Sequence, residues 1–161
     1  MATQAIPIPI LAPLLVTWLG FGLLPKLVVI GLVCFFPIVV TTLSALEAVD
    51  PDLVKLLDTF DAGRVQTLWR AELPSALPGL FAGAKLAAVF SVIAAVLGEQ
   101  AGANSGLGYL LTVTQANLET AAAFATVLVL AALAMMLFAL LSLAERRATP
   151  WIHRQRDTTN R

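Results

Sequence analysis

The residues of this sequence that could take part in chemistry are few and lie far apart. The sequence has one cysteine, Cys34, and one histidine, His153. Neither has a partner at the spacing of a metal site or a catalytic pair. We therefore expect no catalytic residue, no metal site and no cofactor. Cys34 reads as a small apolar group facing lipid or another helix, and His153 as a solvated residue of the tail.

Glu99 is the ionisable residue with the most informative surroundings. It is isolated between two uncharged stretches, 86–98 and 100–118, and a glycine-rich turn follows it at 102–108. A carboxylate at membrane depth is costly, which would place Glu99, with Gly106 and Gly108, at a pathway or gate. At the end of a membrane helix it would instead be solvated at the interface, and both alternatives stay open. The turn lacks the Gly-Lys-Ser/Thr ending of a phosphate-binding loop.

The stretches of sequence that lack charged residues indicate the elements that position these residues. Of the 161 residues, 59% are hydrophobic and 12% are charged, with a net charge of zero. A soluble domain carries about 25% charged residues, so this composition indicates a membrane protein. It excludes a disordered tail, a basic nucleic-acid binder and a disulfide-stapled module.

The uncharged stretches are long enough for membrane helices, which need about 20 residues. We expect one all-α transmembrane domain over 1–161, a polytopic helical bundle with a cytoplasmic two-helix loop. Its spans are expected at about 6–24, 27–46, 79–98 and 120–144, its loop at 47–78 and its cytoplasmic tail at 145–161. Pro7, Pro9 and Pro13 make the first span short or broken. Lys85 is expected to snorkel from one end of its span or to face protein.

Lys and Arg give the orientation. All but Lys26 lie within or beside the loop and in the tail. The positive-inside rule therefore places the loop and the tail in the cytoplasm.

The loop predicts two short amphipathic helices. Asp50 and Pro51 form a helix-start signal, and Leu53, Leu56, Leu57 and Phe60 then share one face. Ala62-Gly63 separates this helix from a second at 64–73, which Pro74 and Pro78 are expected to end. The loop is either an ordinary connection or a docking element for a cytoplasmic partner.

Small residues recur every four positions in the span after the loop, at Gly79, Gly83, Ala87, Ser91 and Ala95. This spacing allows close helix packing in lipid, within the chain or with a second copy. Alanine-rich helices also contain such spacings by chance.

Several strings, in one order, resemble the permeases of bacterial binding-protein-dependent ABC importers. They are PILAPLLVTWLGFG near the start, FFPIVV, AELPSALPGLFAGAK, VLGEQAGANSGLGYLL and ERRATPW, and they cover about residues 6–151. The resemblance is greatest to the branch that takes up nitrate, sulfonates, taurine and thiamine-pyrimidine precursors, with a slight preference for the last.

Such permeases carry a cytoplasmic signature, the EAA loop, which contacts the ATPase. Leu73-Pro74 matches its end, but Lys55, Leu56 and Leu57 replace Glu-Ala-Ala, and Asp61 replaces the signature glycine. The resemblance implies an ATPase-coupling set of Leu56, Leu57, Asp58, Phe60, Asp61, Ala62, Gly63, Arg64, Leu73 and Pro74. The packing set of Gly79, Gly83 and Ala87 follows instead from the spacing of small residues.

The resemblance implies a non-enzymatic permease subunit in the bacterial inner membrane that moves a small organic solute. Its partners would be a cytoplasmic ATP-binding cassette ATPase, an extracytoplasmic solute-binding protein, membrane lipid and a second permease chain, as a homodimer. The alternatives are an ion- or proton-coupled carrier using Glu99 and a non-transporting membrane scaffold. Such permeases have about six spans, so four spans predict a fragment or a shortened form.

Overall fold

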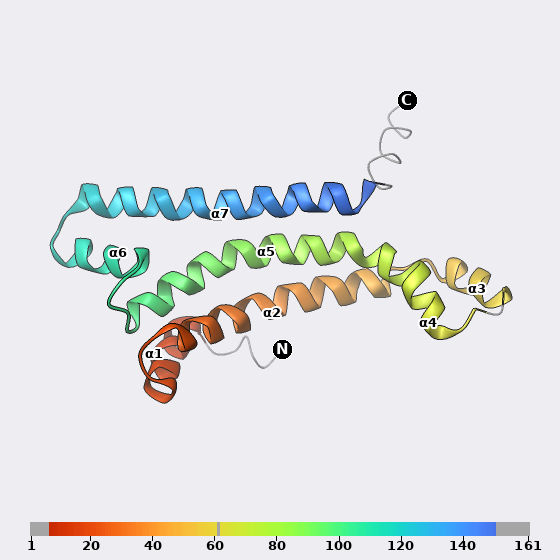
Figure 1. Ribbon diagram of the computed structural model, residues 1–161, viewed down its shortest axis with the longest axis horizontal. Helices are drawn as coiled ribbons and strands as arrows, with labels where there is room; N and C mark the ends of the chain where they lie inside the picture. The colour runs from red at the N-terminus through yellow and green to blue at the C-terminus, as the bar shows by residue number, and fades with distance from the viewer. Residues whose placement is uncertain (1–6, 61, 151–161) are drawn as a thin grey trace, which may run out of the picture. The chain divides into compact units, whose positions relative to one another are not determined.

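The computed structural model describes residues 7–60 and 62–150, apart from the side chains of Ile8 and Asp58. Every regular element in this part of the chain is helical, which confirms the predicted all-α class (Figure 1). The elements are α1 (Ile8–Leu19), α2 (Leu23–Glu47), α3 (Pro51–Thr59), α4 (Arg64–Thr67), a π-helical turn (Leu68–Glu72), α5 (Leu73–Gln100), α6 (Leu107–Ala116) and α7 (Thr120–Ala148).

Three helical segments are long and apolar enough to cross a membrane. They are Leu23–Glu47, Arg64–Gln100 and Thr120–Ala148, of 25, 37 and 29 residues. The helix α1 has 12 residues and includes Pro13 in its interior. At 1.5 Å per residue it is about 18 Å long, which is less than the hydrocarbon thickness. The division into four spans stays a prediction.

The chain divides into two compact units, and each of the three long helices contributes to both. The first unit comprises residues up to Phe36 together with Ala87–Phe138, and so includes α1 and α6. Its core is built from Ala12, Val29 and Ala94, one residue from each of α1, α2 and α5. The alanines of α1 and α5 allow these two helices to approach Val29 of α2 closely. In this unit the Cys34 thiol faces another helix and donates to the Ala87 carbonyl at 3.4 Å.

The second unit comprises Pro37–Leu86 and the chain from Ala139 onward. Here α5 packs tightly against α2 through two glycines. A Cβ on Gly83 would lie 2.8 Å from both the Pro37 carbonyl oxygen and the Ile38 Cα, and one on Gly79 would lie 2.9 Å from the Thr41 carbonyl oxygen. No side chain larger than hydrogen fits at either position without a shift of backbone.

Lys85 faces protein within the second unit. Its ammonium lies 2.7 Å from a carboxylate oxygen of Glu145 on α7, and about one fifth of each side chain is exposed. The pair lets a cation sit in an apolar helix, because each charge replaces part of the other's lost hydration.

The expectation that Pro74 and Pro78 end the second loop helix is wrong. Helical structure runs from Arg64 to Gln100 without a break. Directly before Pro74, the Leu73 N–H donates to the Leu68 carbonyl, five residues back, in a wider π-helical turn. Such a turn accommodates a proline ring, which in a regular helix would meet the carbonyl four residues earlier. Pro78 lies inside α5.

Candidate functional site

Glu99 lies near the end of α5 and is bound on two sides. Its Oε2 accepts a hydrogen bond of 2.7 Å from the Gly108 backbone N–H, and its Oε1 lies 3.9 Å from the Lys26 ammonium. Its side chain is 20% exposed. The carboxylate therefore joins three elements of the first unit, α2, α5 and α6, where the sequence had left a pathway or gate and a solvated helix end as alternatives.

The two glycines of the predicted gate lie directly against this carboxylate. Gly106 has φ +120°, and a Cβ there would overlap the Glu99 carboxyl group. A Cβ on Gly108 would lie 2.7 Å from the Val96 carbonyl oxygen. Glycine at both positions lets the start of α6 lie against the last turns of α5. The structure thus brings Glu99, Gly106 and Gly108 together.

The helix α6 was missed by sequence reasoning, which had described this region as a glycine-rich turn and an uncharged stretch. A signal was present, because Leu107, Leu110, Leu111 and Thr114 follow helical spacing. Thr114 and Gly108 are the buried residues of this helix.

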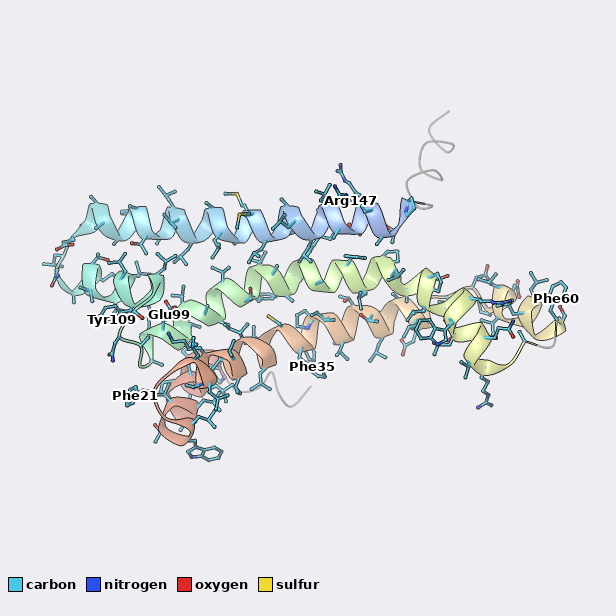
Figure 2. The ribbon with its side chains drawn as sticks, in the orientation of Figure 1. Phe21, Phe35, Phe60, Glu99, Tyr109 and Arg147 are labelled. Atoms are coloured by element: carbon cyan, nitrogen blue, oxygen red, sulfur yellow. The ribbon has the colours of Figure 1, made fainter. Side chains whose placement is uncertain are left out.

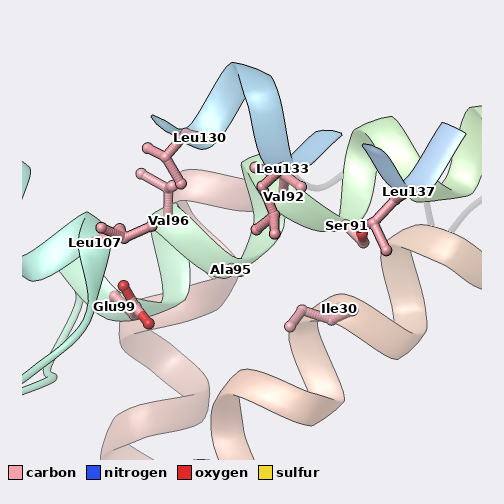
Figure 3. Close-up of a pocket in the computed structure, with 10 residues that line it drawn as sticks. All are labelled: Ile30, Ser91, Val92, Ala95, Val96, Glu99, Leu107, Leu130, Leu133 and Leu137. Atoms are coloured by element: carbon pink, nitrogen blue, oxygen red, sulfur yellow. The ribbon is translucent and has the colours of Figure 1, made fainter. Parts of the chain in front are cut away.

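A cavity of about 250 Å³ lies within the first unit and ends at Glu99 (Figure 3). Of its described lining residues, Ser91 and Glu99 are polar, and the others are Ile30, Val92, Ala95, Val96, Leu107, Leu130, Leu133 and Leu137. Glu99 and Leu107 lie at one end, and Ser91 and Leu137 at the other. The Ser91 hydroxyl donates to the Ala88 carbonyl at 2.8 Å, so toward the cavity it offers lone pairs. Such a cavity can hold a small apolar or heteroaromatic body.

The loop of the second unit exposes apolar side chains on both of its helical parts. Leu56 on α3 is 55% exposed, and Phe60, just after α3, is 75% exposed. Figure 2 shows Phe60 in the loop, at the end of α3. Val65 on α4 and Trp69 on the π-helical turn are 71% and 64% exposed, and sequence reasoning had not singled them out. Exposed apolar side chains gathered on a polar connection indicate a surface that a partner covers.

The start of α3 is the one expected from the sequence. The Asp50 carboxylate accepts a hydrogen bond of 2.9 Å from the Asp52 N–H, and Pro51 is the first residue of the helix. This confirms the Asp50 cap. The cap fixes where α3 begins and therefore which side chains its exposed face carries.

The other residues of the predicted coupling set follow along the loop and into α5. Ala62 and Gly63 form the link between α3 and α4, and the Gly63 carbonyl accepts from the Gln66 N–H at 2.8 Å. Arg64 is exposed at the first position of α4, and Leu73 and Pro74 begin α5. Leu57 is half-buried on α3. Asp61 and the Asp58 side chain lie outside the described part of the chain.

Metal ligation has no support in the described ranges, where no three His, Cys, Asp or Glu side chains gather in an arrangement that could hold an ion. Within the first unit the partly open cavity can hold a small molecule, and within the second unit the exposed loop can contact a partner.

The long apolar helices define a multi-pass membrane protein, and comparison with known proteins gives its family. Residues 1–151 match the family described as the binding-protein-dependent transport system inner membrane component. The chain therefore belongs to this family of inner-membrane permeases, as the resemblance predicted.

Three relatives illustrate its range. The chain is 34% identical to the formylaminopyrimidine transport permease protein ThiX of Halalkalibacterium halodurans, over 96% of the chain and 62% of that protein. It is 34% identical to the riboflavin transport system permease protein RibX of Chloroflexus aurantiacus, over 93% and 56%. It is 32% identical to the taurine transport system permease protein TauC of Escherichia coli, over 90% and 54%. The chain thus spans less than two thirds of the length of these relatives.

Proposed function

We propose that this chain is the membrane-spanning permease subunit of an ATP-driven importer for a small organic solute. The observation that carries the proposal is the exposed apolar loop, in a chain whose family forms the inner-membrane part of binding-protein-dependent transport systems. The chain performs no covalent chemistry, and ATP is hydrolysed by a separate cytoplasmic ATP-binding cassette subunit. An extracytoplasmic binding protein delivers the solute, and a second copy of the chain completes the pathway.

The loop transmits the movement of the ATPase to the membrane helices. Leu56 and Phe60 place their apolar side chains in a groove of the ATPase. Arg64 makes polar contacts at the edge of that groove, and these contacts fix how the loop is aligned in it. Continuous helical structure from Arg64 to Gln100 supports this role, because a displacement of α4 is passed to α5 without a flexible joint. Rocking of the helices then exposes the solute cavity to each side of the membrane in turn.

The cavity supports an uncharged heterocyclic solute better than a sulfonate or nitrate anion. No Lys or Arg occurs among its described lining residues, and both polar side chains there present hydrogen-bond acceptors. The relatives named for formylaminopyrimidine and riboflavin agree with such a solute. A proton-coupled carrier based on Glu99 has less support, because Lys26 and the Gly108 amide already hold that carboxylate.

The coupling role can be tested with a double variant, Leu56→Ala with Phe60→Ala, in vesicles that also contain the ATPase and the binding protein. Loss of two exposed anchors is expected to lower ATPase retention and ATP-driven uptake by about tenfold or more. The matched control is Lys55→Gln, on the opposite side of α3, where an exposed ion pair with Asp52 contributes little. Normal docking and uptake in the double variant would contradict the proposed contact.

A further inference from the structure

The start of α6 is capped by a residue of another helix. The position before α6 is Gly106, which has no side chain to accept from the free N–H groups of the first turn. Glu99 supplies the missing acceptor from α5, through its 2.7 Å bond to the Gly108 N–H. A carboxylate is unfavourable at the C-terminal end of its own helix and favourable at the N-terminus of another. Glu99 therefore stabilises the structure as long as α6 stays in place.

Lys26 adds a third element to this contact. Its ammonium faces the Glu99 carboxylate at 3.9 Å, and its backbone and side-chain carbons lie 3.6 Å from the position that a Cβ on Gly98 would take. The side chains of Lys26 and Glu99 are 17% and 20% exposed. Partial burial makes their attraction stronger than that of a surface pair and makes loss of either partner costly.

The same contact closes one end of the cavity. Leu107, the first residue of α6, and Glu99 both line the cavity, and they lie together at one end of it (Figure 3). We propose that α6 is a lid on this cavity and that Glu99 is the positioning residue that holds the lid closed. Opening of the cavity requires that the Gly108 N–H and Lys26 separate from the carboxylate.

Both ends of α6 have the backbone conformation of a pivot. Gly106 has φ +120°, and Leu118, in the turn that follows, has φ +60°, which a residue with a branched side chain rarely adopts. Leu118 is also 86% exposed, so packing does not hold it there. A freely rotating glycine before this ten-residue helix and a strained leucine after it are where a lid would rotate.

The lid can be tested by the reactivity of a cysteine placed at Leu107, in a Cys34→Ala background and in membrane vesicles without ATP or solute. A maleimide is expected to label Leu107→Cys slowly, and the exposed Leu118→Cys serves as the fully accessible reference. Hydrogen bonds to charged groups are strong enough that Glu99→Ala is expected to speed labelling of Leu107→Cys by about tenfold or more. Glu99→Gln keeps an acceptor for the Gly108 N–H but loses the charge, so a smaller increase is expected.

Lys26→Gln also removes the ion pair but keeps the charged acceptor for the Gly108 N–H, so we expect it to speed labelling no more than Glu99→Gln does. The matched control is Glu119→Gln, an exposed carboxylate in the turn before α7. If Glu99→Ala does not accumulate in membranes, the two glutamine variants decide the question. Unchanged labelling in the Glu99 and Lys26 variants, or an equal increase in Glu119→Gln, would overturn the lid.

The inference rests on the proposed function insofar as the cavity belongs to the solute pathway, but its test does not. Labelling is measured on the chain itself, so a failed lid leaves ATP-driven uptake in place. Conversely, loss of uptake in the loop variants with normal labelling at Leu107→Cys would count against coupling and not against the lid.

Discussion

At the residue scale, Gly83 shows how a single missing side chain sets the distance between two helices. The atoms that a Cβ would meet include backbone atoms of Pro37 and Ile38, and backbone cannot move aside as a flexible side chain can. At Gly31, also within a membrane helix, a Cβ would meet no atom within 4 Å beyond its chain neighbours and the nearby backbone of its own helix. Gly83 and Gly31 are therefore both helical glycines, but Gly83 is closely packed against a second helix and Gly31 is not.

Gly83→Ala is expected to destabilise the protein by about 1–3 kcal/mol, because overpacking forces α2 and α5 apart. Gly31→Ala is expected to be neutral or slightly stabilising, since alanine is the better helix former in open space. Thermal unfolding in detergent measures both. Equal effects of the two substitutions would show that α5 does not depend on this close approach.

Lys85 and Glu145 illustrate how a cation is kept within an apolar helix. Lys85→Met removes one partner and leaves Glu145 with its charge in poor solvent, so we expect a loss of about 3 kcal/mol. Replacing both residues of the pair, as in Lys85→Met with Glu145→Leu, should restore most of the lost stability. The exposed pair of Lys55 and Asp52 provides the control, and Lys55→Met should change stability by less than about 1 kcal/mol. A double variant as unstable as the single one would contradict this account.

At the element scale, the turn after α6 contains Leu118, the described non-glycine residue with a positive φ. Leu118 has a left-handed backbone conformation that is strained for leucine but not for glycine. The adjacent Asn117 has φ −82°, so a glycine there would relieve no strain. The strain belongs to the connection between α6 and α7 and not to the packing of either helix.

Leu118→Gly is expected to raise stability by up to about 1 kcal/mol through relief of this strain. Asn117→Gly, one residue earlier, should lower stability or leave it unchanged. Thermal unfolding in detergent compares them directly. A loss of stability in Leu118→Gly would mean that packing of the leucine side chain contributes more to stability than relief of the backbone strain does.

The elements also show where sequence reasoning succeeded and where it failed. Asp50-Pro51 marks the start of α3 because a cap is a local interaction between neighbouring residues. The prediction that Pro74 and Pro78 end a helix failed because the π-helical turn that accommodates Pro74 cannot be recognised from residue types alone. The cap of α6 comes from a residue eight positions before the first residue of the helix, on another element, which no local rule detects.

At the scale of the whole molecule, the distribution of charge predicts how the chain lies in the membrane. Composition identified a helical membrane protein because membrane length and missing charge are properties of long segments. The pairing of Lys26 with Glu99 could not be predicted, since it depends on which helices pack together. The proposed orientation places Phe60 in the cytoplasm and Leu118 outside.

This orientation can be measured in intact cells with a membrane-impermeant maleimide. In the Cys34→Ala background, Leu118→Cys is expected to react from outside, because the Lys and Arg residues keep the loop and tail inside. Phe60→Cys, also well exposed, should react only after the membrane is permeabilised. The reverse pattern would contradict the positive-inside assignment and move the proposed lid to the cytoplasmic face.

The lengths of α2 and α7 have a consequence for the lipid around them. The uncharged part of α2, residues 27–46, is about 30 Å long, whereas that of α7, residues 120–144, is about 37 Å long. A bilayer whose hydrocarbon thickness suits α2 is thinner than the apolar part of α7, which must therefore tilt or thicken the lipid beside it. Acyl-chain length should thus shift the angle of α7 more than that of α2, so that membrane composition itself acts on the arrangement of these helices.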